Sequence, residues 1–172
     1  MPSVLFVCTA NRFRSPIAAA LFSRRLQQEN PAHDWKVDSA GTWAEPGLAV
    51  VPSPKWISDH FGLNLEKHKA IRIVGGLLEW YDLILVMENS HQESLWVEFP
   101  KMKDKVFLLA KVSTGVAYDV PDPGIIEDDT FLDIATELSD LINNGYQEIC
   151  LLARQLEEVS PRGTKQSSSS SE

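Results

Sequence analysis

The chain has 172 residues, of which 44 % are hydrophobic, so one substantial core is expected and a second full domain is not. Its formal net charge of −8 opposes nonspecific binding to nucleic acid. Apolar stretches are too short for a membrane span, and the opening run lacks the basic start of a signal peptide. We therefore expect no nucleic-acid partner and no membrane partner.

The first 30 residues change pattern abruptly. Ser3 to Cys8 is a continuous apolar run, which is typical of a parallel strand buried on both faces. From Pro16 the apolar residues recur with helical spacing, and Ser15 followed by proline predicts an N-cap and a first helical residue. The segment between them is expected to join a strand to a helix N-terminus.

Strands and helices are predicted to alternate along the rest of the chain. We expect strands at 35–40, 81–87 and 105–110, a helix at 53–61 ended by Gly62, and a short helix at 90–97 capped by Asn89. One long final helix capped by Asp129 is expected to reach Leu156, with a weak point at Asn143-Asn144-Gly145. The alternation predicts one α/β domain, a doubly wound four-stranded parallel sheet with helices on both faces.

The chain changes character near its C-terminal end. Residues 1–159 carry the regular patterns and are expected to form the single domain. Residues 160–172 contain a proline, a glycine and a run of serines, a composition that predicts a disordered tail.

The segment from Cys8 to Ser15 carries the strongest chemical signal. A cysteine and an arginine are separated by five residues, and a serine follows at once. Backbone amides at a helix N-terminus and the Arg14 guanidinium would attract a phosphate and stabilise a thiolate. The candidate phosphate-binding residues are Thr9, Ala10, Asn11, Arg12, Phe13, Arg14 and Ser15. The plain alternative is a buried core cysteine beside a surface arginine.

A phosphoryl transfer to sulfur also needs an acid for the leaving group. Asp122 lies between Pro121 and Pro123, so its backbone is expected to be extended and stiff, which suits a positioned proton donor. The same residues, with Gly124, also favour an ordinary turn without any catalytic role.

Together these segments resemble the low-molecular-weight protein tyrosine phosphatase family. The resemblance spans roughly residues 3 to 157 and rests on four motifs in the family's order. These are the loop from Cys8 to Pro16, Asp38-Ser39-Ala40-Gly41-Thr42, the strand from Tyr81 to Met87, and Val120-Pro121-Asp122-Pro123.

The resemblance implies roles for particular residues and the phosphotyrosine protein phosphatase I-like fold. Cys8 is the implied nucleophile, Arg14 the phosphate clamp and Asp122 the general acid. The implied supporting residues are Asn11, Ser15, Ser39 and His68. His68 can also be interpreted as a solvated histidine at a helix end.

The implied reaction hydrolyses a phosphotyrosine protein or a small phosphate monoester through a cysteinyl phosphate. Because loop amides and arginine stabilise the phosphoryl oxygens, the mechanism requires no metal and no cofactor. Two cysteines without Cys-x-x-Cys spacing argue against a disulfide framework or a zinc site. Since the site needs a reduced thiol, we expect a cytoplasmic enzyme, monomeric or weakly dimeric.

Three departures from the family pattern bear on specificity and redox behaviour. Phe13 stands where the family usually has a second cysteine, so we expect oxidised Cys8 to lack a local resolving partner. Ala10 stands where the loop often has glycine, and a positive φ there would be strained. Gly124 follows the Asp-Pro pair where aromatic residues are common. Trp43 is a candidate substrate wall in their place, and a half-buried loop tryptophan is an equally good interpretation. Arg12 is a second candidate that would favour acidic residues around the phosphorylated site, although a solvated residue at the rim is the simpler interpretation.

Three other functions remain open from the sequence. An arsenate reductase uses a similar loop but needs further cysteines, and Cys150 alone is a poor candidate. A phosphoarginine phosphatase of the same family differs only in pocket shape. A non-catalytic phosphate-carrying or phosphopeptide-binding module would have no use for Asp122.

Overall fold

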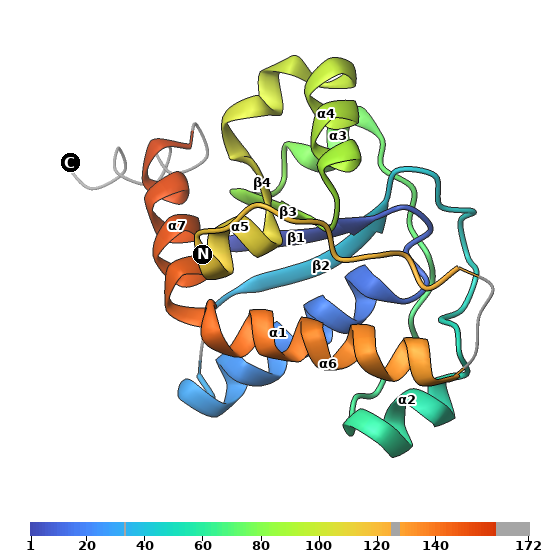
Figure 1. Cartoon of the computed structure of the whole chain (residues 1–172). Helices are drawn as coiled ribbons and strands as arrows, with labels where there is room; N and C mark the ends of the chain where they lie inside the picture. Colours follow the sequence, from blue (N-terminus) through green and yellow to red (C-terminus); the bar gives the residue numbers. More distant parts are fainter. Residues whose placement is uncertain (33, 125–127, 161–172) are drawn as a thin grey trace.

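The computed structural model describes residues 1–32, 34–124 and 128–160. Four parallel strands form one sheet in the order β2-β1-β3-β4 (Figure 1). Their bounds are β1 Ser3–Cys8, β2 Lys36–Gly41, β3 Leu83–Val86 and β4 Val106–Leu108. The predicted doubly wound parallel sheet is confirmed, with β1 in the interior of the sheet.

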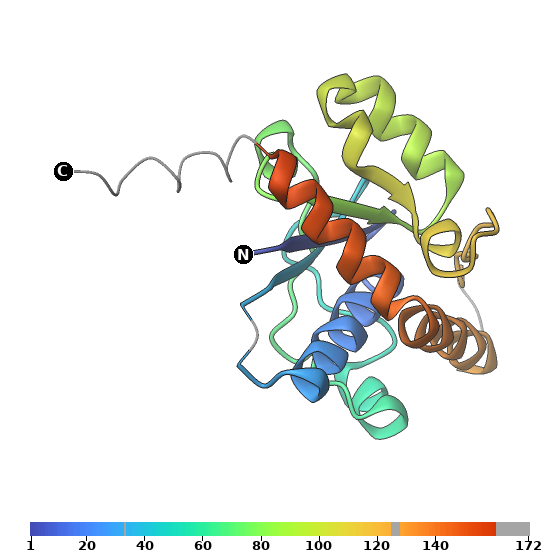
Figure 2. The same cartoon turned by 90° about the vertical axis from the view of Figure 1, so that its left-hand side faces the viewer.

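Helices cover both faces of this sheet (Figure 2). Their bounds are α1 Arg14–Glu29, α2 Pro54–Phe61, α3 Gly75–Leu78, α4 Asn89–Glu98, α5 Leu109–Thr114, α6 Asp128–Asn144 and α7 Tyr146–Val159, with a 3₁₀ helix at Pro100–Lys105. Helices α1, α6 and α7 pack on one face, and α3 and α4 pack on the other.

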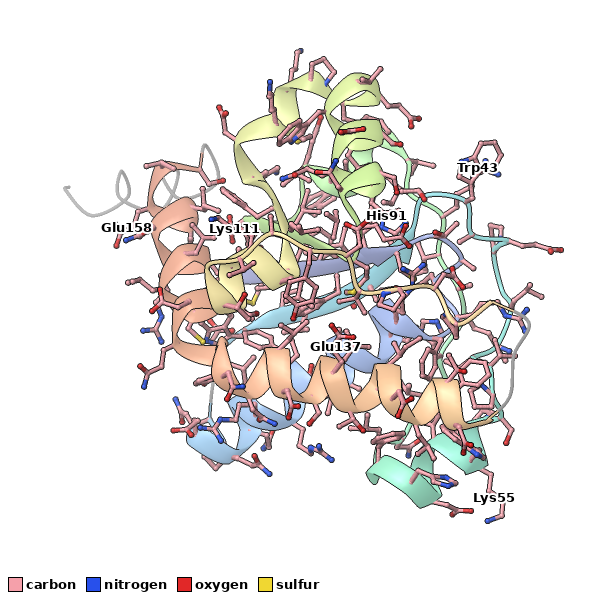
Figure 3. The ribbon with its side chains drawn as sticks, viewed as in Figure 1. Trp43, Lys55, His91, Lys111, Glu137 and Glu158 are labelled. Carbon is pink, nitrogen blue, oxygen red and sulfur yellow. The ribbon has the colours of Figure 1, made fainter. Side chains whose placement is uncertain are left out.

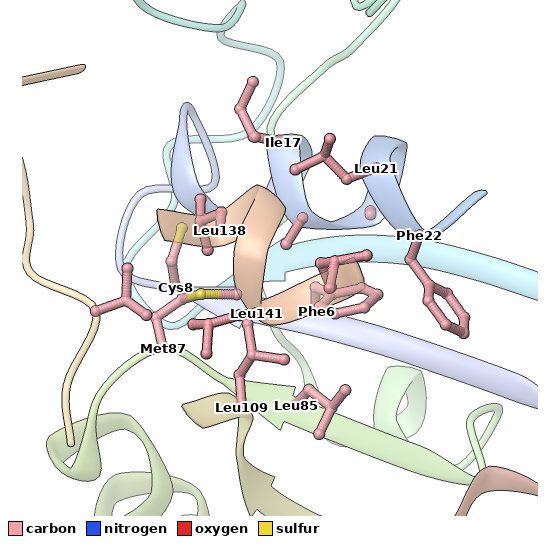
Figure 4. Packing of buried hydrophobic residues seen from close by; sticks show 14 of the residues in the cluster. Phe6, Cys8, Ile17, Leu21, Phe22, Leu85, Met87, Leu109, Leu138 and Leu141 are labelled. Atoms are coloured by element: carbon pink, nitrogen blue, oxygen red, sulfur yellow. The ribbon is translucent and has the colours of Figure 1, made fainter. Parts of the chain in front are cut away.

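The apolar run of β1 divides its side chains between the two cores. Phe6 and Cys8 lie in the larger core under α1 and α6, whereas Leu5 and Val7 lie in the smaller core under α4. Successive side chains of a strand point to opposite faces, so both faces of β1 must be apolar. Figure 4 shows Phe6 and Cys8 among the buried residues of the larger core.

The C-terminal region corrects one prediction. The expected single helix is two helices, α6 and α7, separated at Gly145, and it begins at Asp128 rather than being capped by Asp129. A Cβ atom on Gly145 would lie 2.6 Å from the Cα of Ser113 in α5. Close approach of two backbones therefore requires glycine at this bend.

Local boundaries correct several smaller predictions. Helix α1 begins at Arg14, so Ser15 lies inside the helix and is not its N-cap. Glu88, not Asn89, caps α4, and the last two residues of the predicted fourth strand begin α5. Helix α2 ends as predicted, at Gly62 with φ 63°. The predicted serine-rich tail lies, apart from its first residue, outside the described residues.

Candidate active site

The loop between β1 and α1 lies at the carboxyl end of the sheet, where open α/β sheets bind ligands. Backbone hydrogen bonds attach this loop to the residues that follow β2. Thr42 N–H donates to the Cys8 carbonyl and Trp43 N–H to the Thr9 carbonyl, both at 2.9 Å. A side chain at Gly41 would clash with the Thr9 carbonyl oxygen and come within 3.0 Å of Asn11 N. Glycine at this position therefore lets the loop pack directly on β2.

Cys8 is buried at the floor of this loop and is 2 % exposed. Its Sγ lies 3.0 Å from Ser15 Oγ and accepts the Asn11 backbone N–H at 3.3 Å. An amide and a hydroxyl therefore converge on the Cys8 sulfur beside the N-terminal end of α1.

Asn11 braces the loop from inside. Its Nδ2 donates to Ser15 Oγ at 2.9 Å and to Ser39 Oγ at 2.8 Å, and its Oδ1 accepts Ile71 N–H at 2.9 Å. The residue is fully buried with φ 54°, and it is the one non-glycine residue of the described chain in the left-handed region. The strain expected at Ala10 is therefore absent, because asparagine tolerates this conformation better than alanine.

His68 supports the same loop from the segment before α3. Its Nε2 lies 2.8 Å from the Asn11 carbonyl oxygen, so this nitrogen carries a proton and donates it. Burial lowers the pKa of His68, and the hydrogen bond to Asn11 opposes that shift. The sequence-predicted residues Asn11, Ser15, Ser39 and His68 thus form one connected network.

Arg14 is 2 % exposed and joins three parts of the chain. Its Nη1 donates to the Val120 carbonyl at 2.8 Å and pairs with Glu88 Oε1. Its Nη2 donates to Asp122 Oδ2 at 2.7 Å. Asp122, which is far from Cys8 and Arg14 in sequence, therefore meets the arginine of their loop at one end of the sheet.

Asp122 is held from two sides. While Oδ2 binds Arg14, Oδ1 accepts Gly124 N–H at 2.8 Å, which closes a short side-chain turn. The side chain is nevertheless 54 % exposed. Asp122 therefore forms a turn, as the sequence allows, and also faces the arginine of the loop.

Two side chains that contact the loop, those of Glu88 and His91, escaped the sequence analysis. Glu88 and His91 form a reciprocal capping box at the start of α4. His91 Nε2 lies 2.8 Å from Thr9 Oγ1. Glu88 follows the carboxyl end of β3, beside β1, so strand order would have pointed to it.

The less typical residues of the loop face different surroundings. Phe13 is buried, and its ring packs edge-on to Phe131 at 4.8 Å between centroids. Arg12 Nε donates to the Ala49 carbonyl at 2.9 Å. Trp43, which is labelled in Figure 3, is 75 % exposed. The Arg72 guanidinium lies 5.0 Å from its ring centre. Trp43 therefore offers aromatic surface near the loop, whereas Phe13 belongs to the core.

No group of three or more histidine, cysteine or acidic side chains within residues 1–32, 34–124 and 128–160 is arranged to hold a metal ion. None of the helices among the described residues has the length and hydropathy needed to cross a membrane.

An open parallel α/β sheet with a cysteine-to-arginine anion loop after its first strand defines a class of phosphate-handling proteins. Residues 3–156 match the family model described as low molecular weight phosphotyrosine protein phosphatase. The chain belongs to this family of protein phosphatases, which confirms the resemblance drawn from the sequence.

Similar proteins carry two different activities in their names. The chain is 32 % identical over 148 residues to a protein-arginine-phosphatase of Bacillus subtilis, covering 85 % of this chain and 95 % of that protein. It is 36 % identical over 136 residues to the low molecular weight protein-tyrosine-phosphatase Wzb of Escherichia coli, covering 79 % and 87 %. A crystal structure of the low molecular weight protein tyrosine phosphatase of T. tengcongensis superposes with a TM-score of 0.78 at 32 % identity, covering 86 % and 99 %.

Proposed function

We propose that this protein hydrolyses phosphotyrosine and related aryl phosphate monoesters through a cysteinyl phosphate on Cys8. One observation carries the proposal: the buried sulfur accepts an amide hydrogen bond at 3.3 Å in a loop whose arginine binds Asp122 at 2.7 Å. The proposed nucleophile, anion clamp and acid thus lie at the same end of the sheet, which supports a phosphoryl transfer to sulfur.

The reaction proceeds in two displacements. The Cys8 thiolate attacks phosphorus in line, the bond from phosphorus to the phenolic oxygen breaks, and Asp122 gives its proton to the departing oxygen. Asp122 then takes a proton from water, whose oxygen attacks the cysteinyl phosphate and releases phosphate and the thiolate. Loop amides and Arg14 stabilise the equatorial phosphoryl oxygens in both steps.

Ser15 has a specific part in the second displacement. Its Oγ lies 3.0 Å from Cys8 Sγ while it accepts a hydrogen from Asn11 Nδ2. The hydroxyl hydrogen has two acceptors within reach, Cys8 Sγ and the Ala40 carbonyl oxygen at 3.3 Å, and in the second displacement it points at the sulfur that leaves as a thiolate. Stabilising this leaving group accelerates hydrolysis of the intermediate.

Cys8→Ser tests the nucleophile. Turnover of an aryl phosphate should be abolished, whereas binding of inorganic phosphate or vanadate should persist, because the loop amides and Arg14 remain. Cys150→Ser is the matched control, since Cys150 is buried in α7 and burial raises the pKa of its thiol. Substantial turnover by Cys8→Ser would overturn the mechanism.

Asp122→Asn tests the acid. The variant should lose far more activity on phosphotyrosine than on activated aryl phosphates, whose leaving groups need little proton donation. Asp119→Asn is the control, because Asp119 lies on the same segment but accepts a hydrogen bond from Asn89 N–H instead of binding Arg14. Equal losses on both substrates would place the general acid elsewhere.

Phosphoarginine is the second candidate substrate. The similarity to a protein-arginine-phosphatase over 95 % of that protein's length favours it. The exposed Trp43 ring already stacks with one guanidinium, that of Arg72. The candidate substrates are distinguished by kinetics on matched phosphotyrosine, phosphoarginine and phosphoserine peptides, with arsenate reduction measured alongside. A kcat/KM for phosphoarginine above that for phosphotyrosine would reassign the substrate.

We further propose a cytoplasmic protein, monomeric or weakly dimeric, whose catalytic domain comprises residues 1–159. Cys8 and Cys150 are both free thiols, as a reducing compartment such as the cytoplasm would keep them. We expect a monomer or a weak dimer, measured by sedimentation at several concentrations. A chain ending at residue 159 should retain the activity of the full chain if the domain comprises residues 1–159.

A further inference from the structure

His91 is a buried histidine to which the proposed mechanism gives no part. It is 4 % exposed and lies at the carboxyl end of the sheet (Figure 3). Its Nδ1 accepts the Glu88 backbone N–H at 3.1 Å, which leaves Nδ1 without a proton. The proton of the neutral ring is therefore on Nε2, which donates to Thr9 Oγ1 at 2.8 Å.

The Thr9 hydroxyl oxygen has a second donor. Arg14 Nη2 points at Thr9 Oγ1 from 3.4 Å. A hydroxyl oxygen has two lone pairs and one hydrogen, so two donors occupy its acceptor positions. The remaining O–H must then donate to a third group. Thr9 is the first residue after Cys8, and its hydroxyl shares Arg14 with the expected phosphoryl group.

The charges around His91 favour the neutral ring. Burial lowers its pKa, and the Arg14 guanidinium acts in the same direction. Three carboxylates raise it: Glu88 at the start of α4, and Asp119 and Asp122 on the segment after α5. Burial prevails, so the pKa of His91 lies below its ordinary value and the ring keeps its tautomer at neutral pH.

We propose that His91 is a positioning residue which fixes the Thr9 hydroxyl so that its hydrogen is donated to a phosphoryl oxygen of the substrate. The proposal rests on the phosphatase function proposed for the same pocket. It adds a side-chain donor to the loop amides and Arg14, and it makes Thr9 a residue that contacts the substrate.

A pair of Thr9 variants tests the donated hydrogen. Thr9→Ser keeps the hydroxyl and should retain kcat/KM for an aryl phosphate within about threefold of wild type. Thr9→Val removes the hydroxyl and should lose roughly 10- to 100-fold, the range for one hydrogen bond to a charged group. Equal losses in the two variants, or no loss in Thr9→Val, would overturn the proposal.

A double-mutant cycle tests the positioning role. His91→Phe should lower kcat/KM about tenfold with Thr9 present and less than about twofold in the Thr9→Val background, because the hydroxyl that His91 orients is then absent. A purely structural histidine would give the same loss in both backgrounds, which would contradict the proposal. Thermal unfolding of each variant identifies those that are simply destabilised, and the pair of Thr9 variants decides the matter if His91→Phe does not fold.

Binding of inorganic phosphate separates this proposal from the proposed function. Calorimetry should show weaker phosphate binding by Thr9→Val than by Thr9→Ser, whether or not the wild type turns over any phosphate ester. If no phosphate ester is turned over but Thr9→Val binds phosphate more weakly than Thr9→Ser, only the phosphatase function is refuted. Equal phosphate affinity of the two variants would refute the role of the Thr9 hydroxyl alone.

Discussion

Asn11→Ala should strongly destabilise both the fold and the loop. The side chain makes three hydrogen bonds in a fully buried position, to Ser15, Ser39 and the Ile71 N–H. At about 1 kcal/mol each they contribute roughly 3 kcal/mol. Alanine in the left-handed conformation at φ 54° costs about 1 kcal/mol more. The free energy of unfolding should therefore fall by about 4 kcal/mol.

Urea denaturation of wild type and variant measures this loss, and steady-state kinetics on an aryl phosphate measure its consequence for the loop. We expect kcat/KM to fall with stability, because Asn11 also holds Ser15 beside Cys8. Asn64→Ala is the control: it removes one exposed hydrogen bond, from Glu66 N–H at 3.2 Å, and should cost less than about 1 kcal/mol. A loss below 1 kcal/mol for Asn11→Ala, or undiminished activity, would refute the assignment of Asn11 as the brace.

Three further changes have defined outcomes. Gly41→Ala should reduce phosphate affinity and activity, because the new methyl group would displace the Thr9 carbonyl; unchanged phosphate binding by calorimetry would contradict the packing of the loop on β2. Peroxide-inactivated wild type should recover little activity after thiol treatment, because Phe13 supplies no thiol to trap oxidised Cys8, and full recovery would argue against this. Because the pKa of His68 is lowered in the folded protein, the unfolded chain binds more protons than the folded one as the pH drops through about 6.5. The free energy of unfolding should therefore fall with decreasing pH, by at most about 1.4 kcal/mol per pH unit. Between pH 7.5 and pH 5.5 the free energy of unfolding should fall less for His68→Asn than for wild type, as measured by urea denaturation. An equal fall in both proteins would refute the assignment of this pH dependence to His68.

The β1 strand and its loop were predictable because their determinants are local. An apolar run buried on both faces, a loop and a helical repeat from Pro16 all lie within 30 consecutive residues. The roles of Glu88 and His91 depend instead on β3 lying beside β1. Capping signals at α4 did not reveal this, since asparagine is the better N-cap residue by composition, yet Glu88 and not Asn89 caps the helix.

The division of the last helix was not predictable from periodicity. Apolar residues keep their helical spacing across Gly145, and a spacing pattern does not report a change in axis direction. What fixes the bend is the contact of Gly145 with Ser113, a tertiary approach between α5 and the start of α7. The glycine was visible in the sequence as a weak point, but its partner was not.

The two carboxylates at Arg14 have different consequences for the proposed mechanism. A guanidinium that is 2 % exposed needs counter-charges when the pocket holds no anion, and Glu88 and Asp122 supply them. A phosphoryl group competes with both for the same N–H groups. Each carboxylate also accepts one backbone N–H, Glu88 from His91 and Asp122 from Gly124, but the Glu88 side chain is 25 % exposed and that of Asp122 is 54 % exposed. Asp122 is therefore the partner that a substrate displaces more readily, and displacement from Arg14 leaves its carboxyl group available to the leaving oxygen.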